Sequence, residues 1–143
     1  SFLALPLLFL PSVMKKVLIL EQEKTIRQSL LHIMERYSGF EVFAASSFKE
    51  GFSLFKALPF DIVLCGHRLP DGDGLEILRE WMKQRPQLIS VLMTASNDER
   101  LKVEAKKAGI RGYLEKPFDL RQLEEAIGSS EMALPFSNGV LSC

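Results

Sequence analysis

The sequence of 143 residues is poor in cysteine and in tryptophan, and it carries no net charge. Its two cysteines, Cys65 and Cys143, form no disulfide framework, which fits a reducing compartment such as the cytoplasm. Because 18 basic residues balance 18 acidic ones, no excess positive charge exists for a nucleic-acid surface. Apolar residues make up 47% and charged residues 25%, a balance that excludes global disorder and predicts one globular domain.

Residues 1–13 form an apolar extension that lacks the features of a membrane or secretory segment. They are too few for a membrane span, are interrupted by Pro6 and Pro11, and have no basic start. We therefore predict no membrane association and interpret this extension as a leader, or as sequence added before a true start at Met14. Two alternatives remain open: an apolar arm that packs on a groove or a neighbouring molecule, and a targeting signal.

From Met14 onward, short apolar runs alternate with segments of helical period. Strands are expected at 17–20, 42–45, 62–65, 89–93 and 112–114, each followed by a helix, with Ser47, Ser96 and Asp119 as helix caps. Strands joined by helical crossovers run parallel, and the helices cover both faces of the sheet. We predict a doubly wound α/β sandwich over residues 14–128, followed by a tail or linker at 129–143.

In such a sandwich, ligand chemistry gathers at the carboxyl ends of the strands. The first strand is followed by Glu21-Gln22-Glu23, which lacks glycine and would repel phosphate, so a nucleotide-binding turn is excluded. The acidic loop Asp71–Gly74 lacks the later oxygen ligands of an EF-hand. His32 and His67 have no second ligand at metal spacing, so no metal site is predicted.

Four motifs in order resemble one family, the response-regulator receiver domain, the CheY-like module of two-component signalling. They are the acidic residues after the first strand, Leu69–Gly74 after the third, Thr94-Ala95 after the fourth and Lys116–Phe118 after the fifth. The resemblance spans about residues 15–128 and implies a flavodoxin-like fold with strand order 2-1-3-4-5. In that family, an aspartate ending strand three accepts a phosphoryl group from a histidine kinase, and acidic residues after strand one hold Mg²⁺. A Thr and a Lys contact the phosphoryl oxygens, and an aromatic on strand five changes rotamer.

This chain follows the family's motifs but differs from them at the positions that carry the phosphoryl chemistry. Counting back from Pro70 places the phosphoacceptor position at Gly66, which has no nucleophile. The acidic pair falls on Glu21 and Gln22, so one carboxylate is an amide. The positions that match are Thr94 and Lys116, as phosphoryl contacts, and Tyr113, as either the switch aromatic or a plain half-buried strand residue.

The loss of carboxylates changes the charge expected in the pocket. A complete receiver pocket has more carboxylates than lysines, and a divalent cation relieves their repulsion. Here the negative charge of Glu21 balances the positive charge of Lys116, so we expect the two side chains to approach each other directly or through water. We expect Mg²⁺ binding to be weak or absent. Glu23 is expected to face solvent, and the resemblance implies a cis peptide bond at Lys116-Pro117, where the general preference of such bonds is trans.

The resemblance implies an atypical receiver domain in phosphorelay signalling, not an enzyme, that acts by phosphorylation-independent protein–protein recognition. Its implied contact surface is the face formed by the fourth helix, fifth strand and fifth helix. The partner would be a signalling protein or an output domain, with a histidine kinase and a second copy of the chain as further options.

Two other functions remain open at this point. The domain could be phosphorylated on a displaced loop aspartate, Asp71 or Asp73, although the neighbouring glycines favour a turn role for both. Alternatively, it could sense a small ligand that binds near Lys116.

Overall fold

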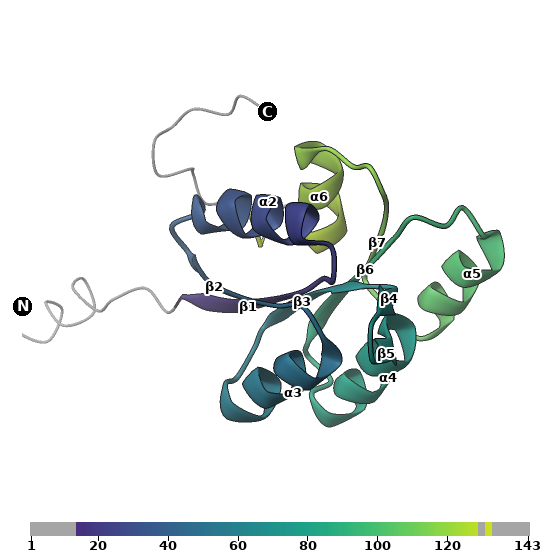
Figure 1. Cartoon of the computed structure of the whole chain (residues 1–143), viewed down its shortest axis with the longest axis horizontal. Coiled ribbons are helices and arrows are strands. Elements are labelled where there is room, and N and C mark those ends of the chain that lie inside the picture. The colour runs from purple at the N-terminus through teal and green to yellow at the C-terminus, as the bar shows by residue number, and fades with distance from the viewer. Residues whose placement is uncertain (1–13, 129–130, 133–143) are drawn as a thin grey trace, which may run out of the picture.

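A computed structural model describes residues 14–128 and 131–132 of the chain, and a central sheet with helices on both sides dominates it (Figure 1). The sheet strands are β1 (Lys15–Leu20), β2 (Phe40–Ala45), β3 (Ile62–Gly66), β6 (Ile89–Thr94) and β7 (Gly112–Glu115). All neighbours pair in parallel, in the order β2-β1-β3-β6-β7. This order confirms the predicted 2-1-3-4-5 topology, because β6 and β7 are the fourth and fifth strands of the sheet.

The helices lie in two layers, as right-handed crossovers require. Their bounds are α2 (Lys24–Glu35), α3 (Phe48–Ala57), α4 (Gly74–Gln84), α5 (Glu99–Lys107) and α6 (Leu120–Ile127). Figure 1 shows α2 and α6 on one face of the sheet and α3, α4 and α5 on the other. Strand side chains alternate between the layers: Val17 and Ile19 pack on the α2/α6 side, whereas Leu18 and Leu20 pack on the opposite side.

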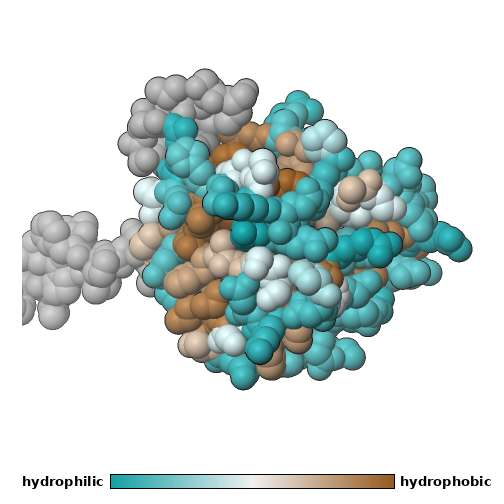
Figure 2. Space-filling model, viewed as in Figure 1, coloured by the Kyte–Doolittle hydropathy of each residue, from teal (hydrophilic) through white to brown (hydrophobic). Residues whose placement is uncertain are grey.

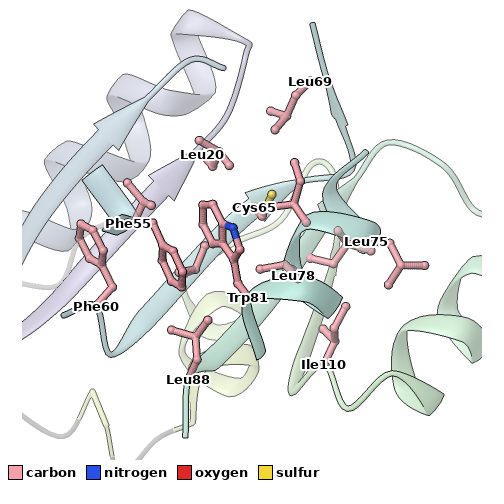
Figure 3. Close-up of a cluster of buried hydrophobic side chains, with 14 of the residues drawn as sticks. Leu20, Phe55, Phe60, Cys65, Leu69, Leu75, Leu78, Trp81, Leu88 and Ile110 are labelled. Atoms are coloured by element: carbon pink, nitrogen blue, oxygen red, sulfur yellow. The ribbon is translucent and has the colours of Figure 1, made fainter. Parts of the chain in front are cut away.

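The larger core lies beneath α3 and α4 and is built around Trp81. The Trp81 ring stacks on Phe55 with centroids 4.0 Å apart and planes 6° apart, and both side chains are buried (Figure 3). The guanidinium of Arg85 lies 3.8 Å from the centre of the Phe55 ring and donates to the carbonyl of Leu58. These contacts fix the last turn of α4 against the end of α3.

The structure differs from the sequence prediction in two local details. The loop after β3, expected to be turns only, contains a short antiparallel hairpin of β4 (Arg68–Leu69) and β5 (Gly72–Asp73). Asp98, not Ser96, caps α5, because the Ser96 hydroxyl instead accepts the Asp98 N–H in the preceding turn. The expected caps at Ser47 and Asp119 are both confirmed.

Two further findings concern the described helices and the end of the described region. None of the helices within it combines the length and the apolar composition that crossing a bilayer requires. Met132 is buried against the core on the α2/α6 side. The extension at 1–13 and most of the tail lie outside the described residues, so their interpretation stays a prediction.

Candidate functional site

The candidate residues lie at one edge of the sheet, where four parallel strands end. Glu21 follows β1, Gly66 is the last residue of β3, Thr94 is the last residue of β6, and Lys116 follows β7. Because parallel strands present their carboxyl ends on the same side, residues from four distant segments meet there. The structure therefore brings together the positions that the sequence pattern singled out.

The centre of the site is an ion pair between Glu21 and Lys116. The Lys116 Nζ lies 2.7 Å from Glu21 Oε1, and the two side chains are 14% and 1% exposed. Because both side chains are largely shielded from solvent, water screens this attraction little. The predicted approach of these two residues is confirmed, and the structure shows that it is direct.

Glu23 also takes part in this ion pair. Its side chain is 57% exposed, as predicted, yet its Oε1 accepts a hydrogen bond from Lys116 Nζ at 3.3 Å. Its backbone N–H donates to Glu21 Oε2 at 2.9 Å. Arg27, which the sequence analysis did not consider, donates to the backbone carbonyls of Glu21 and Gln22 at 2.9 and 3.1 Å. The loop after β1 is thus fixed by its own hydrogen bonds.

Gly66 lies directly beside Glu21 because of the strand register. Leu20 pairs with Cys65 across β1 and β3, so the next residues along, Glu21 and Gly66, are neighbours on adjacent strands. A Cβ at Gly66 would lie 3.0 Å from Glu21 Oε1 and 3.5 Å from its Cδ. The Glu21 carboxylate therefore borders the space that a side chain at position 66 would enter.

On the other side of the site, Thr94 contacts His67. The Thr94 Oγ1 lies 3.4 Å from His67 Nδ1 and accepts the Ser96 N–H at 3.0 Å. The Nε2 of His67 lies 3.7 Å from the Asp73 carboxylate. The sequence analysis considered His67 only as a metal ligand, and the signal that could have placed it in the site was its position directly after Gly66.

Lys116 is carried by a loop whose first peptide bond is cis. The Lys116-Pro117 bond has this geometry, as predicted. Tyr113, on β7, is half-buried, and its hydroxyl is enclosed without a hydrogen-bond partner in the described part of the chain. Burial, followed by the carboxylates of Glu115, Asp98 and Glu99, raises the pKa of Tyr113. The ring is therefore a neutral group that packs against the core beneath α5.

The residues of the site do not suit the Mg²⁺ ion that the resemblance implies. Divalent cations of this kind need several oxygen ligands. The Glu21 oxygens face Lys116 and the Glu23 N–H, while Gln22 is exposed and Gly66 has no side chain. Within residues 14–128 and 131–132, no three carboxylate, imidazole or thiol groups are placed to hold a metal ion.

A small cavity opens beside the ion pair. It has a volume of about 120 Å³ and is lined chiefly by Gln22, Glu23, His67, Arg68, Thr94 and Lys116. Sites for small organic ligands usually measure about 300–1,000 Å³. The cavity has room for a few water molecules or a small ion rather than for a metabolite.

The loop aspartates serve other parts of the fold. Asp71 accepts the N–H groups of Phe48 and Lys49 at 2.7 and 2.9 Å, so it holds the start of α3. Asp73 caps α4 by accepting the Glu76 N–H at 3.2 Å. Both carboxylates complete helix N-termini, where they satisfy backbone donors that would otherwise lack partners.

Replacing Asp71 with alanine is expected to destabilise the domain at neutral pH, because the start of α3 loses an acceptor. The hydrogen bond from Lys49 is the largest cause that lowers the pKa of Asp71 below its ordinary value of 3.8; burial opposes it, and Phe48 adds to it. A lowered carboxyl pKa contributes stability above the unfolded value, and this is lost as the pH falls through the folded value. Thermal unfolding against pH should show the difference from wild type shrinking in acid. A difference that persists unchanged in acid would contradict this role.

Comparison with known proteins identifies a family of similar sequence and fold. The family model described as "Response regulator receiver domain" matches residues 17–128. Two solved receiver domains superpose closely, each over more than nine-tenths of its own length. The one from Clostridium thermocellum has a TM-score of 0.73 at 31% identity, covering 84% of this chain and 95% of that one. A CheY-like one from Methanospirillum hungatei has a TM-score of 0.74 at 30% identity, covering 82% and 94%.

Curated relatives are longer proteins. The response regulator protein PilR of Pseudomonas aeruginosa is 34% identical over 116 residues, which are 81% of this chain and 26% of PilR. The KDP operon transcriptional regulatory protein KdpE of Escherichia coli is 33% identical over 111 residues, 78% of this chain and 48% of KdpE. The chain thus spans about a quarter to a half of these relatives. Receiver domains of this kind work with histidine kinases and output domains in two-component signalling, and this chain belongs to the response regulator receiver domain family.

Proposed function

We propose that this receiver domain acts without phosphorylation of an aspartate, by recognising a protein partner. The observation that carries the proposal is Gly66, which ends β3 at the position that the resemblance assigns to the phosphoacceptor. Phosphoryl transfer to a receiver needs a carboxylate oxygen as nucleophile, and glycine supplies none. The departure of Gln22 from the acidic pair supports the same conclusion, because it removes a ligand for the metal that assists the transfer.

The geometry of the loop disfavours a displaced phosphoacceptor. Asp71 and Asp73 are both engaged as helix caps, and neither lies in contact with Lys116. A nucleophile must lie close to the groups that stabilise the transferred phosphoryl group.

We propose the face formed by α5, β7 and α6 as the surface that binds the partner. A groove of about 420 Å³ runs along β7 and is lined by side chains of both signs, among them Lys102, Arg111, Glu115 and Glu125. Figure 2 shows a mainly hydrophilic surface over α5, whereas apolar surface gathers toward α3 and β2. A partner at this face would be selected by charge complementarity more than by apolar burial. The partner would be an output domain or another signalling protein, in the cytoplasm.

Intact mass spectrometry after incubation with acetyl phosphate and Mg²⁺ tests the proposed function. The wild-type protein is expected to gain no phosphoryl adduct under conditions in which a receiver with an intact acceptor aspartate is labelled. An adduct that disappears in the Asp71→Asn or Asp73→Asn variant would establish the displaced phosphoacceptor instead. An adduct that survives both changes would place an acceptor elsewhere and would equally overturn the proposal.

A further inference from the structure

The carboxylate of Glu21 is held beside the position where the family's acceptor side chain would be. Glu21 and Gly66 occupy adjacent register positions, and a Cβ at Gly66 would be 3.0 Å from Glu21 Oε1. Along the alternation of β1, Glu21 falls on the same face as Val17 and Ile19, and Gly66 falls on the face of Ile62 and Leu64. These four residues pack in one cluster, so Glu21 and position 66 share the α2/α6 side of the sheet.

The same carboxylate is attached at both of its oxygens. Its Oε1 lies 2.7 Å from Lys116 Nζ, and its Oε2 accepts the Glu23 N–H at 2.9 Å. Lys116 has a second carboxylate partner, Glu23, at 3.3 Å. Water screens the exposed Glu23 strongly, whereas Glu21 is 1% exposed, so the Glu21 contact is the stronger of the two.

The second phosphoryl-contact residue also has partners inside the chain. Thr94 Oγ1 accepts the Ser96 N–H and lies 3.4 Å from His67 Nδ1. Both residues that would contact a phosphoryl group are therefore occupied by groups of the protein itself. Since an occupied lysine and hydroxyl need no added anion to hold their positions, the loops that carry them can be ordered without phosphorylation.

We infer that Glu21 replaces the missing acceptor carboxylate and that its ion pair with Lys116 holds the loop between β7 and α6 in one conformation. Glu21 is a positioning residue, and Gly66 permits its placement by leaving the adjacent space free. This inference rests on the proposed function, since it describes how the domain keeps one state without a phosphoryl group. It adds that the state depends on a single side chain.

Nuclear magnetic resonance of Glu21→Gln tests the inference, with Glu23→Gln as the matched control. The side-chain ammonium signal of Lys116 is expected to be visible in the wild type, because an ion-paired ammonium group exchanges slowly with water. It should disappear in E21Q and persist in E23Q. Amide exchange at Glu115, Lys116 and Phe118 should become about tenfold faster in E21Q, while the central strand β3 is unaffected.

Glu21→Asp is the second variant, and it decides the matter if E21Q does not fold. It keeps the charge but withdraws the carboxylate from Lys116 by one methylene, so it should also lose the ammonium signal. If E21Q or E21D retains both the signal and the slow exchange, or if E23Q loses them equally, Glu21 does not hold the loop. These outcomes are independent of the mass measurement, because a phosphoryl adduct would refute the proposed function and leave the ion pair to be judged by its own signal.

Discussion

Replacing Gly66 with aspartate is expected to destabilise the domain by about 3 kcal/mol when no divalent cation is present. The new side chain would start 3.0 Å from Glu21 Oε1, in a part of the site where Glu21 is 1% exposed. Two carboxylates would then share the single ammonium group of Lys116, and burying an unpaired charge costs several kcal/mol. An aspartate at this position is therefore expected to be unfavourable in this particular site.

Mg²⁺ is expected to reverse much of this loss. Two adjacent carboxylates supply oxygen ligands that Mg²⁺ accepts, and any ion that binds only the folded state stabilises it by mass action. Thermal unfolding with EDTA and with increasing Mg²⁺ measures the effect. The wild type should change little with Mg²⁺, and Gly66→Asn, which has the same shape without the charge, should not respond either. Equal stability of G66D and G66N in EDTA would show that Glu21 does not oppose a second carboxylate.

The same variant is expected to accept phosphate poorly. Gln22 offers an amide in place of the metal-binding carboxylate that the resemblance leads us to expect there, and Glu21 still contacts Lys116. Labelling by acetyl phosphate should therefore be weak in G66D and should rise when Gln22→Asp is added. Robust Mg²⁺-dependent labelling of the single variant would mean that Glu21 leaves Lys116 readily, and that the ion pair is not a barrier to the chemistry.

The layered α/β sandwich could be predicted from short-range patterns, whereas the strand order and the meeting of Glu21 with Lys116 were predicted from the family resemblance. Buried parallel strands appear as continuous apolar runs such as Val17–Leu20, and the helices between them fix the direction of every strand. The approach of Glu21 to Lys116 could be predicted because the resemblance places both residues in one pocket, where their opposite charges balance. The structure adds the register of β1 and β3, which makes Glu21 and Gly66 neighbours across the sheet.

The contacts of the loop after β3 could not be predicted, because they depend on three-dimensional placement. Asp71 caps α3, a helix that begins 23 residues earlier in the chain, and no local pattern indicates that partner. His67 reaches Thr94 only because β3 and β6 lie side by side. The β4–β5 hairpin was likewise missed, since each of its strands has two residues, too few for a periodic signal.

Gly74→Ala is expected to lower stability by about 3 kcal/mol, although alanine is the better helix former. A Cβ at Gly74 would lie 2.1 Å from the carbonyl oxygen of Gly66 and 2.9 Å from its carbonyl carbon. These are backbone atoms, and the Gly74 N–H already donates to the His67 carbonyl at 2.7 Å, so neither side can yield without separating α4 from β3. The packing of Trp81 on Phe55 holds α4 in place and prevents the helix from absorbing the shift.

Gly72→Ala, two residues earlier, is the matched control for this prediction. A Cβ there would lie 3.1 Å from Ile77 Cδ1, the mobile end of a side chain that can turn aside, so the stability should change by less than about 1 kcal/mol. In thermal unfolding, G74A should melt about 10 °C below wild type and G72A within a few degrees of it. The amide signals of Gly66 and His67 should move in G74A alone, because α4 presses on the backbone at the position of the missing acceptor. Equal melting temperatures for the two variants would mean that α4 can withdraw freely and that the glycine is not what allows its close approach.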